Sequence, residues 1–261
     1  MSLPTVPGSF RWTAESWGAG LRCVPLEALA PHVFASRHLA LTSDGELALA
    51  GALGVDAIAM VTQVHGRTVT VVRDARIPER TTEADALIGN VPATALAVRA
   101  ADCVPLLLAD HGSGAVAAVH AGWRGTAAGV ATEAVAALGR EFGTRPADIV
   151  AAIGPAIGPC CYEVGSELVD AFAAAGHDRQ LIARWFPTPA PPRGSRTLPA
   201  LRLDVAGANR DQLILAGVPE AQIFSCGLCT AMHLDVLTSY RAEGNAAGRI
   251  VAAIRPRPSR I

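Results

Sequence analysis

The first half of the chain carries short hydrophobic runs, each bounded by glycine, aspartate, asparagine or proline. Runs of this length with turn-forming residues at both ends are typical of buried strands. The strands that this pattern predicts cover residues 57–62, 68–72, 95–100, 104–110 and 115–121. An alanine-rich segment follows and predicts the first long helix at 126–142, with Gly143 as its C-terminal stop.

Helical and strand patterns are mixed in the second half of the chain. They predict strands at 148–154, 221–224 and 249–255, and helices at 163–175 and 204–216. Because runs of strands mix with helices without strict alternation, the expected fold class is α+β with a mixed sheet. The one linker-like stretch, 187–196, is short enough to be a surface loop, so residues 1–261 are expected to form a single domain.

The composition favours a soluble globular protein, with 51% hydrophobic residues and a formal net charge of -1 over 261 residues. No block of like charge is present, which argues against nucleic-acid binding and against a polybasic membrane anchor. The basic stretch "RPRPSRI", 255–261, is expected to be a solvated tail. No apolar run approaches the ~18 residues that span a bilayer and no signal-peptide pattern follows Met1, so a cytoplasmic location is expected.

Three residues stand at comparable positions, each at the edge of a predicted strand and beside glycine or aspartate. They are His65 in "TQVHG", Cys103 in "AADCVPLLL" and His120 in "AVHAGWRG". Two imidazoles and a thiolate make a three-ligand site with a fourth position open to water, the arrangement that zinc adopts for catalysis. If they bind one ion, their ligand atoms should converge within about 4 Å of one point, since zinc bonds run ~2.0 to 2.3 Å.

Two other interpretations of these residues stay open. Cys103 can be a nucleophile with His120 as its base, as in cysteine hydrolases, although this leaves His65 without a role. All three can also be ordinary structural residues, since free cysteine is among the most buried residue types. The mutation His65→Ala separates the two functional interpretations, because only a three-ligand site should lose a metal.

The remaining polar candidates have weaker patterns. Asp85 in "EADALIGN" and Asp102 beside Cys103 can orient ligand imidazoles, or can serve as turn and cap residues. Arg124 can bind an anion or stack on the indole of Trp123.

The six cysteines are too few for a disulfide scaffold, and in a reducing compartment they should be thiols or ligands. Cys226 and Cys229 have the spacing of a redox motif in "CGLC", but the pattern favours two buried thiols. Cys160 and Cys161 are adjacent, and adjacent thiols rarely form a ligand pair because their side chains diverge. No role is predicted for these four cysteines.

A series of motifs resembles the laccase-domain family of purine nucleoside phosphorylases, whose members have also been called polyphenol oxidases. The resemblance covers roughly residues 58–250, and a series of that length in one order is very improbable by chance. The motifs are, in order, "VTQVHG", "EADALIGN", "AVRAADCVPLLLAD", "AVHAGWRGTAAGV", "AAIGPAIGPCCYEVG", "LDVAGANRDQL" and "SYRAEG".

The resemblance implies a four-layer α/β/β/α fold with mixed sheets, related to the cysteine-dependent deamidases. It also implies a purine nucleoside phosphorylase that deaminates adenosine, with zinc bound by His65, Cys103 and His120. Adenosine, inosine or methylthioadenosine would react with phosphate to give the free base and a pentose 1-phosphate. The expected partners are therefore a nucleoside and phosphate, and the protein is expected to be a monomer or a small homo-oligomer.

The same resemblance assigns roles to further residues. Cys103, His120 and Arg37 are the expected catalytic residues, and Arg37 and Arg124 are the expected substrate-binding residues. Leu39 and Ala40 stand where members of the family usually have glycines after this arginine.

The older oxidase name can be tested by counting ligands. A multicopper oxidase needs a blue-copper site and a trinuclear cluster rich in imidazoles, and seven histidines scattered along the chain cannot supply both. A mononuclear copper at the same three ligands stays open, because copper outcompetes zinc at nitrogen and sulfur sites when it is present. A non-catalytic binding protein is the last alternative.

Overall fold

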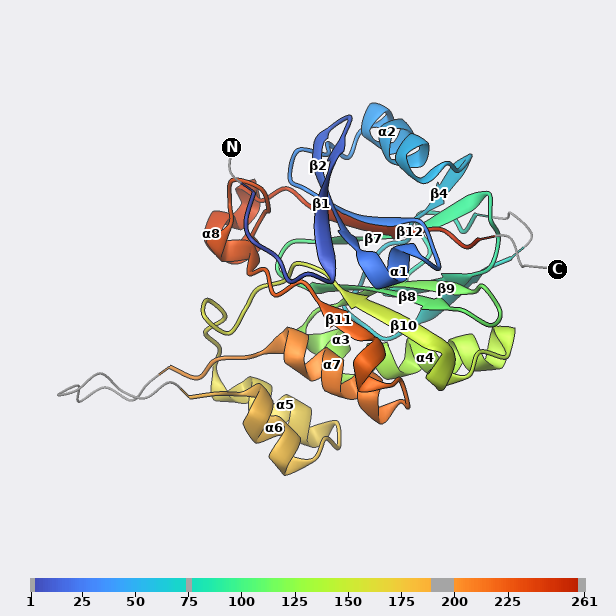
Figure 1. The fold of residues 1–261 in the computed structure, drawn as a ribbon. Helices are drawn as coiled ribbons and strands as arrows, with labels where there is room; N and C mark the ends of the chain where they lie inside the picture. The colour runs from blue at the N-terminus through green and yellow to red at the C-terminus, as the bar shows by residue number, and fades with distance from the viewer. Residues whose placement is uncertain (1–2, 74–76, 189–199, 258–261) are drawn as a thin grey trace.

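Two six-stranded sheets pack face to face between two layers of helices, which gives four layers in the order α/β/β/α (Figure 1). The computed structural model describes residues 3–73, 77–188 and 200–257. The layering confirms the α+β class and the four-layer arrangement expected from the sequence. Among the helices in the described residues, none has the length and apolarity needed to cross a bilayer.

The first sheet contains the N-terminal strands and the last strand of the chain. In spatial order its strands are β1 (Phe10–Glu15), β2 (Gly18–Cys23), β3 (His32–Ala35), β12 (Ile250–Ile254), β7 (Thr94–Ala100) and β4 (Ala57–Ala59). All neighbours are antiparallel except β4 and β7, which are parallel. Helix α2 (Ser43–Leu53) covers the outer face, where Leu49 and Leu53 join a core cluster with Val33 and Val251.

The second sheet positions the residues of the candidate site. In spatial order its strands are β11 (Ile223–Ser225), β10 (Ile149–Ile153), β8 (Val104–Asp110), β9 (Val116–Ala121), β6 (Ala86–Gly89) and β5 (Val69–Val72). The two outer pairs, β10 with β11 and β5 with β6, are parallel, and the inner neighbours are antiparallel. Both sheets are therefore mixed, as the sequence predicted.

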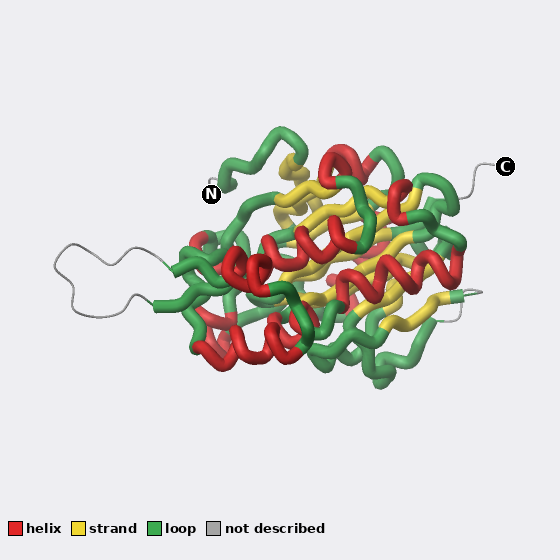
Figure 2. The backbone as a smooth tube through the Cα atoms, turned by 90° about the horizontal axis from the view of Figure 1, so that it is seen from below, coloured by secondary structure: helices red, strands yellow, loops and turns green. Residues whose placement is uncertain are grey.

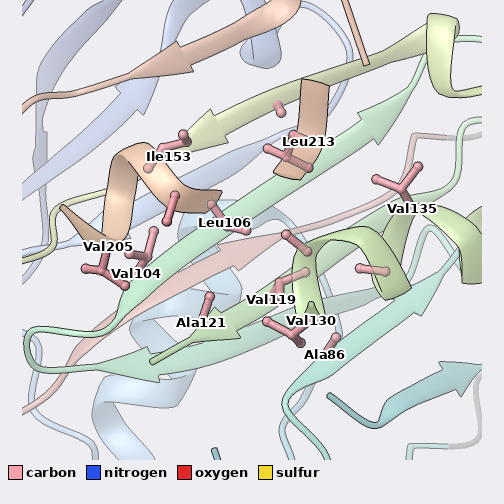
Figure 3. Packing of buried hydrophobic residues seen from close by; sticks show 14 of the residues in the cluster. Ala86, Val104, Leu106, Val119, Ala121, Val130, Val135, Ile153, Val205 and Leu213 are labelled. Atoms are coloured by element: carbon pink, nitrogen blue, oxygen red, sulfur yellow. The ribbon is translucent and has the colours of Figure 1, made fainter. Parts of the chain in front are cut away.

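The second sheet is covered by helices on the face that points away from the first sheet (Figures 1 and 2). The helices of this layer are α3 (Trp123–Ala127), α4 (Val130–Phe142), α5 (Ser166–Ala174), α6 (Arg179–Trp185) and α7 (Val205–Leu215). Val130 of α4 and Leu213 of α7 lie in one core cluster with Leu106 of β8 (Figure 3). The short elements that complete the described chain are α1 (Val24–Glu27), α8 (Tyr240–Glu243) and the 3-10 helices Pro146–Asp148, Glu220–Gln222, Thr230–Met232 and Gly244–Ala246.

Strand β8 shows why the sequence pattern identified the central strands. Successive side chains of a strand point to opposite faces of the sheet. Leu106 and Leu108 lie in the core beneath the helices, whereas Leu107 and Ala109 lie in the core between the two sheets. A strand buried on both faces is hydrophobic at every position, so it stands out as a continuous run.

The single helix predicted at 126–142 is in fact two helices. Gly129 adopts a left-handed conformation with φ of 80°, which a right-handed helix cannot continue, so α3 ends and α4 begins on either side of it. Side chains of α7 hold this break: Asn209 Nδ2 donates to Thr126 Oγ1 (2.8 Å) and Gln212 Nε2 donates to Thr126 O (2.7 Å). The break therefore depends on a tertiary contact that the local pattern does not contain.

The C-terminal stretch, expected to be a solvated tail, is docked in its described part. The Arg257 guanidinium donates to Ala28 O (2.7 Å) and Glu27 O (3.0 Å), and the Arg255 N–H donates to Pro31 O (2.9 Å). Residues 258–261, and most of the loop predicted at 187–196, lie outside the described residues.

Candidate metal centre

His65, Cys103 and His120 come together at one end of the second sheet, and we call them the His–Cys–His group. Cys103 directly precedes β8 and His120 lies in β9, and these strands are antiparallel neighbours in which Pro105 pairs with His120. His65 comes from the loop between β4 and β5. The ligand atoms of the three residues all lie within 4.8 Å of one another, which is close enough for one ion to contact all three. The structure thus brings together the residues that the sequence singled out.

The carboxylate of Asp85 fixes the orientation of His120. Asp85 is fully buried just before β6, and its Oδ1 lies 2.8 Å from His120 Nδ1. Because this contact occupies Nδ1, the other ring nitrogen of His120, Nε2, is the one free to act as a ligand. One of the two orienting roles considered from the sequence therefore belongs to Asp85.

The same carboxylate shapes the loop that carries His65. The backbone N–H groups of His65 and Gly66 donate to Asp85 Oδ1 (2.9 Å) and Oδ2 (2.6 Å), and that of Val64 donates to Oδ2 (3.3 Å). His65 has a φ of 61°, a left-handed conformation that is uncommon for a residue with a side chain. Burial raises the pKa of Asp85, but the hydrogen bonds with His120 and with the Gly66 and His65 N–H groups lower it more, so the pKa lies below its ordinary value. One anion therefore organises two of the three ligands.

A glycine lets the three side chains approach each other. A Cβ atom on Gly122 would lie 2.9 Å from both Cys103 Sγ and His65 Cδ2, closer than carbon normally approaches either atom. Gly122 follows β9 directly, in the "HAGW" stretch. The glycine after His120 is therefore part of the site, which explains why this strand ends in a glycine turn.

The titratable groups of the site act on each other. Burial raises the pKa of the Cys103 thiol, but hydrogen bonds with the His120 and His65 imidazoles lower it more, to about 7. Burial lowers the pKa of His120, but hydrogen bonds with Asp85 and Cys103 raise it more, to about 9. In the metal-free chain, the two groups therefore stabilise each other's charged forms, a Cys103 thiolate beside a His120 imidazolium.

For Asp102, the structure supports the other alternative considered from the sequence, a turn residue. Its carboxylate accepts from Thr230 Oγ1 (2.6 Å) and from the Arg241 N–H (2.6 Å), and its backbone has a φ of 82°. Asp102 is thus a turn residue that ties the chain before Cys103 to the loop after β11.

Sequence reasoning missed two residues beside the site, Tyr162 and Arg241, although both lie in motifs of the family resemblance. The Arg241 guanidinium lies over the Tyr162 ring at 5.1 Å. Burial and the nearby Cys103 raise the pKa of Tyr162 to about 12, and the charges of Arg241 and Arg124 act on the same hydroxyl. The motifs "AAIGPAIGPCCYEVG" and "SYRAEG" contain Tyr162 and Arg241, but a motif alone does not predict which of its residues lies near Cys103.

The two arginines expected to bind substrate have different surroundings. Arg124 is exposed and its guanidinium stacks on Trp123 at 4.3 Å, which is one of the two alternatives considered from the sequence. Arg37 instead donates to Leu237 O (3.3 Å) and pairs with Glu243 (2.8 Å). The roles predicted for both stay predictions, and Arg37 would have to exchange its present contacts for substrate.

Leu39, which stands where a glycine is usual in the family, is buried in the core cluster beside α2. The neighbouring Ala40 is exposed, and its carbonyl oxygen lies against Gly45 of α2. The departure from the family pattern therefore gives a leucine that packs rather than a free glycine turn.

The donor set of the His–Cys–His group suits a zinc or copper ion. It offers two imidazole nitrogens and one thiolate, it leaves a coordination position for a fourth ligand, and a buried carboxylate orients one imidazole from behind. The four cysteines for which no role was predicted differ from the expectation in one respect. Cys226 and Cys229 are both buried, as the pattern favoured. Cys229 also lies within 4.8 Å of Cys160 and Cys161, so the adjacent thiols do not diverge from a common point.

Comparison with known proteins places the chain in a family. The model of the family described as multi-copper polyphenol oxidoreductase laccase matches residues 42–257, so the chain belongs to that family. A purine nucleoside phosphorylase from Streptomyces coelicolor is 39% identical over 251 residues, covering 94% of this chain and 96% of the relative. The crystal structure of a hypothetical protein, YfiH, from Bacillus licheniformis superposes with a TM-score of 0.82 at 26% identity, covering 96% of this chain and 100% of that one.

Other relatives carry two kinds of name. A purine nucleoside phosphorylase from Bacteroides thetaiotaomicron is 39% identical over 170 residues, covering 65% of this chain and 60% of the relative. An adenosine deaminase from an unknown prokaryotic organism is 35% identical over 221 residues, covering 81% of this chain and 80% of the relative. The chain therefore matches less than two thirds of some curated relatives and nearly the full length of others.

Proposed function

We propose that this chain is a zinc-dependent purine nucleoside phosphorylase that also deaminates adenosine. The observation that carries the proposal is the convergence of the three ligand atoms of the His–Cys–His group within 4.8 Å, with His120 oriented by Asp85. The substrate class is supported by the names of the relatives, which are phosphorylases and, in one case, an adenosine deaminase.

The metal ligands of this proposal are His65, Cys103 and His120. Zinc bound there would supply Lewis acidity, which lowers the pKa of water toward about 7. The chain itself contributes the fixed geometry: Asp85 holds the His120 ring and the His65 loop, and Gly122 leaves the space in which the ligand atoms meet.

Phosphorolysis needs a cation that holds phosphate and a group that stabilises charge on the departing purine. Arg124 is the phosphate-binding residue of this proposal. It is exposed, and it lies near the site, because its charge and the charge of Cys103 both act on the Tyr162 hydroxyl. Arg241 supplies a second cation over the Tyr162 ring. Tyr162, with its pKa raised to about 12, stays protonated and can donate a hydrogen bond to the purine.

The two reactions differ in the co-substrate. In deamination, water replaces the amino group at C6 of adenosine and releases inosine and ammonia, whereas phosphorolysis transfers the ribose to phosphate and releases adenine. Because only phosphorolysis consumes phosphate, the two activities can be measured separately on one preparation.

The first test is elemental analysis of protein purified without added metal, together with product analysis on adenosine. We expect bound zinc, adenine and ribose 1-phosphate when phosphate is present, and inosine with ammonia when it is absent. Metal-free protein with full turnover would contradict the proposal, and bound copper with oxidation of a phenol would favour the mononuclear copper oxidase.

The second test is the mutation Arg124→Gln, which removes the charge and keeps most of the side chain. We expect the KM for phosphate to rise about 10- to 100-fold, since a hydrogen bond to a charged group is worth about 1.5–3 kcal/mol. Deamination should change little. An equal loss in both reactions would show that Arg124 does not act through phosphate. The matched control is Arg67→Gln, an exposed arginine on the His65 loop whose guanidinium contacts only a backbone carbonyl among the described residues.

One observation favours a second candidate function, a cysteine hydrolase or deamidase. The Cys103 thiolate, the His120 imidazolium and the Asp85 carboxylate form a chain of nucleophile, base and orienting acid, with the pKa of Cys103 lowered to about 7. The cysteine hydrolase would use Cys103 and His120, two of the three proposed metal ligands, and would give His65 no role. Because a hydrolase of this kind needs no metal, the metal dependence of activity separates the two candidates.

A further inference from the structure

Two segments that are far apart in the sequence, one after β10 and one after β11, bring three cysteines together. These strands are parallel, with Ile153 paired to Ser225, so their following segments leave the sheet at the same edge. The segments then pair with each other, because the Ala156 N–H donates to Leu228 O (3.2 Å) and the Thr230 N–H donates to Ala156 O (3.0 Å). Cys229 is thereby placed against the turn that carries Cys160 and Cys161.

The turn itself keeps the adjacent thiols on one side. The N–H groups of Cys161 and Tyr162 both donate to Gly158 O at 3.0 Å, which closes a tight turn. The Gly158 N–H donates to Cys229 Sγ at 3.3 Å. The three sulfur atoms all lie within 4.8 Å of one another, and we call these residues the three-cysteine group.

Gly158 provides the room for this approach. A Cβ at this position would lie 3.3 Å from Cys160 Sγ, which is tighter than usual, and 3.6 Å from Cys229 Sγ, so a side chain there would crowd the Cys160 sulfur and fill the space beside that of Cys229. A hydrogen bond from a backbone N–H to a sulfur is also a common feature of metal–thiolate sites, where it tunes the ligand. The glycine therefore acts on the three-cysteine group as Gly122 acts on the His–Cys–His group.

We propose that the three-cysteine group is a second metal site, which binds Cu(I). Three thiolates form a soft donor set, and soft sulfur ligands select Cu(I) over harder ions. Structural zinc sites almost always have four protein ligands, whereas among the described residues no fourth cysteine, histidine or carboxylate joins this group. Three sulfur ligands satisfy Cu(I), so the group needs no further partner. This inference does not depend on the nucleoside chemistry proposed above.

Arg202 holds the turn of the three-cysteine group on one side, and a cavity opens to the sulfurs on another. Arg202 Nη1 donates to Pro159 O (3.2 Å) and to Cys160 O, which fixes the turn and places a positive charge beside the three sulfurs. Cys160 and Cys229 line a cavity of about 420 Å³ together with Asp204 and Arg210 of the α7 end, and no member of the His–Cys–His group lines it. Cys160 is exposed, so an ion can reach the sulfurs from solvent.

The test is an anaerobic titration of the full chain with Cu(I). Before the titration, all six cysteines are reduced and their thiols are counted, and the protein is then loaded with zinc. The probe is Cu(I) alone, presented with a competing chromogenic chelator. We expect one Cu(I) per chain with zinc retained, and an X-ray absorption spectrum with three sulfur neighbours. Cys160→Ala and Cys229→Ala should each weaken Cu(I) binding by about 100-fold or more, because even the loss of a residue behind a ligand costs 10- to 100-fold.

The matched control is Cys226→Ala, which removes a buried thiol from the same segment but outside the group. Its Cu(I) affinity should equal that of the unaltered chain. Because Cys160 is exposed, Cys160→Ala should also keep the unaltered melting temperature, so weakened binding there is not a folding effect. Cu(I) uptake only in exchange for zinc, nitrogen neighbours in the spectrum, an equal loss in Cys226→Ala, or displacement of Cu(I) by excess zinc would each overturn the proposal.

Discussion

The His–Cys–His group and the three-cysteine group are built in similar ways but have different neighbours. The first gathers its ligands from two loops and from β9, whereas the second gathers them from the segments that follow β10 and β11; each has a glycine where a Cβ would crowd a sulfur. At the first, hydrogen bonds from two imidazoles overcome burial and lower the pKa of Cys103 to about 7. At the second, partial desolvation and hydrogen bonds with the other two thiols raise the pKa of Cys160 to about 12. The surroundings of a thiol, rather than the thiol itself, decide whether it is ionised at neutral pH.

The two groups also meet at one turn. The Ile157 N–H donates to Asp102 O (2.9 Å) and Thr230 Oγ1 donates to Asp102 Oδ1 (2.6 Å), so the segments that carry the three cysteines hold the residue before Cys103. The comparison is therefore tested with substitutions that lie away from this shared turn, so that each acts on one group and leaves the other unchanged.

The largest effect is expected from His65→Ala. The His–Cys–His group should lose its metal, and nucleoside turnover should fall about 100-fold or more. A metal ligand contributes more to metal affinity than the residues that hydrogen-bond to it, whose loss already costs about 10- to 100-fold. The measurements are metal content and initial rates, and the control is His111→Ala, an exposed histidine beside Asp148 and outside both groups. Full activity in His65→Ala would favour the cysteine hydrolase. Cu(I) binding by the three-cysteine group should not change.

A smaller effect is expected from Asp85→Asn, which acts on the first group without removing a ligand. We expect metal affinity to fall about 10- to 100-fold. The free energy of unfolding should fall by about 1–3 kcal/mol, because buried N–H groups lose their charged acceptor. Asp170→Asn, at an exposed position of α5, serves as the control for stability. Unchanged metal affinity would show that the His120 ring is held by other contacts.

The same substitution has a defined pH dependence. The pKa of Asp85 is lowered in the folded chain, so its stabilising contribution is present above the ordinary value of 3.8 and is lost as the pH falls through the lowered one. The stability difference between the unaltered chain and Asp85→Asn should therefore be constant near neutral pH and shrink in acid. Denaturation curves at a series of pH values measure it.

The smallest effect is expected from Gly122→Ala. The new methyl group would lie 2.9 Å from Cys103 Sγ and His65 Cδ2, so these side chains must shift, and we expect metal affinity to fall about tenfold. Gly51→Ala on α2 meets nothing within 4 Å and should instead raise the free energy of unfolding by roughly 0.5–1 kcal/mol. If Gly122→Ala binds metal as well as the unaltered chain, the close approach does not matter for the site.

The His–Cys–His group could be predicted because its residues mark the ends of hydrophobic runs. Strands β8 and β9 are buried on both faces, so a polar residue at their ends is conspicuous, and the family motifs fall on the same positions. Asp85 was only one of two candidates, because a carboxylate at a strand end looks the same whether it faces an imidazole or closes a turn. The hydrogen bonds of Asp85 and Asp102 separate the two.

The three-cysteine group could not be predicted, because it depends on the parallel pairing of β10 with β11 and on a tight turn at Gly158. Neither is visible in the local pattern, which suggested that adjacent thiols diverge. The strands β1 to β3 were also missed. Strand β1 lies at the sheet edge and is partly exposed, β2 contains two glycines and an arginine, and β3 has only four residues. A strand that is partly exposed to solvent, or that has only a few residues, gives a weak hydrophobic pattern in the sequence.

The central claim is that Cys103 is a metal ligand, and alkylation tests it most directly. Iodoacetamide labelling at pH 7–8 can be mapped to each cysteine by mass spectrometry, with the exposed Cys160 as an internal reference whose high pKa keeps it slow. We expect Cys103 to react slowly in the metal-loaded protein and quickly after a chelator has removed the metal, because its pKa near 7 leaves a free thiolate. Rapid labelling of Cys103 in fully metal-loaded protein, with activity lost in step and the metal retained, would contradict the claim and establish Cys103 as a nucleophile.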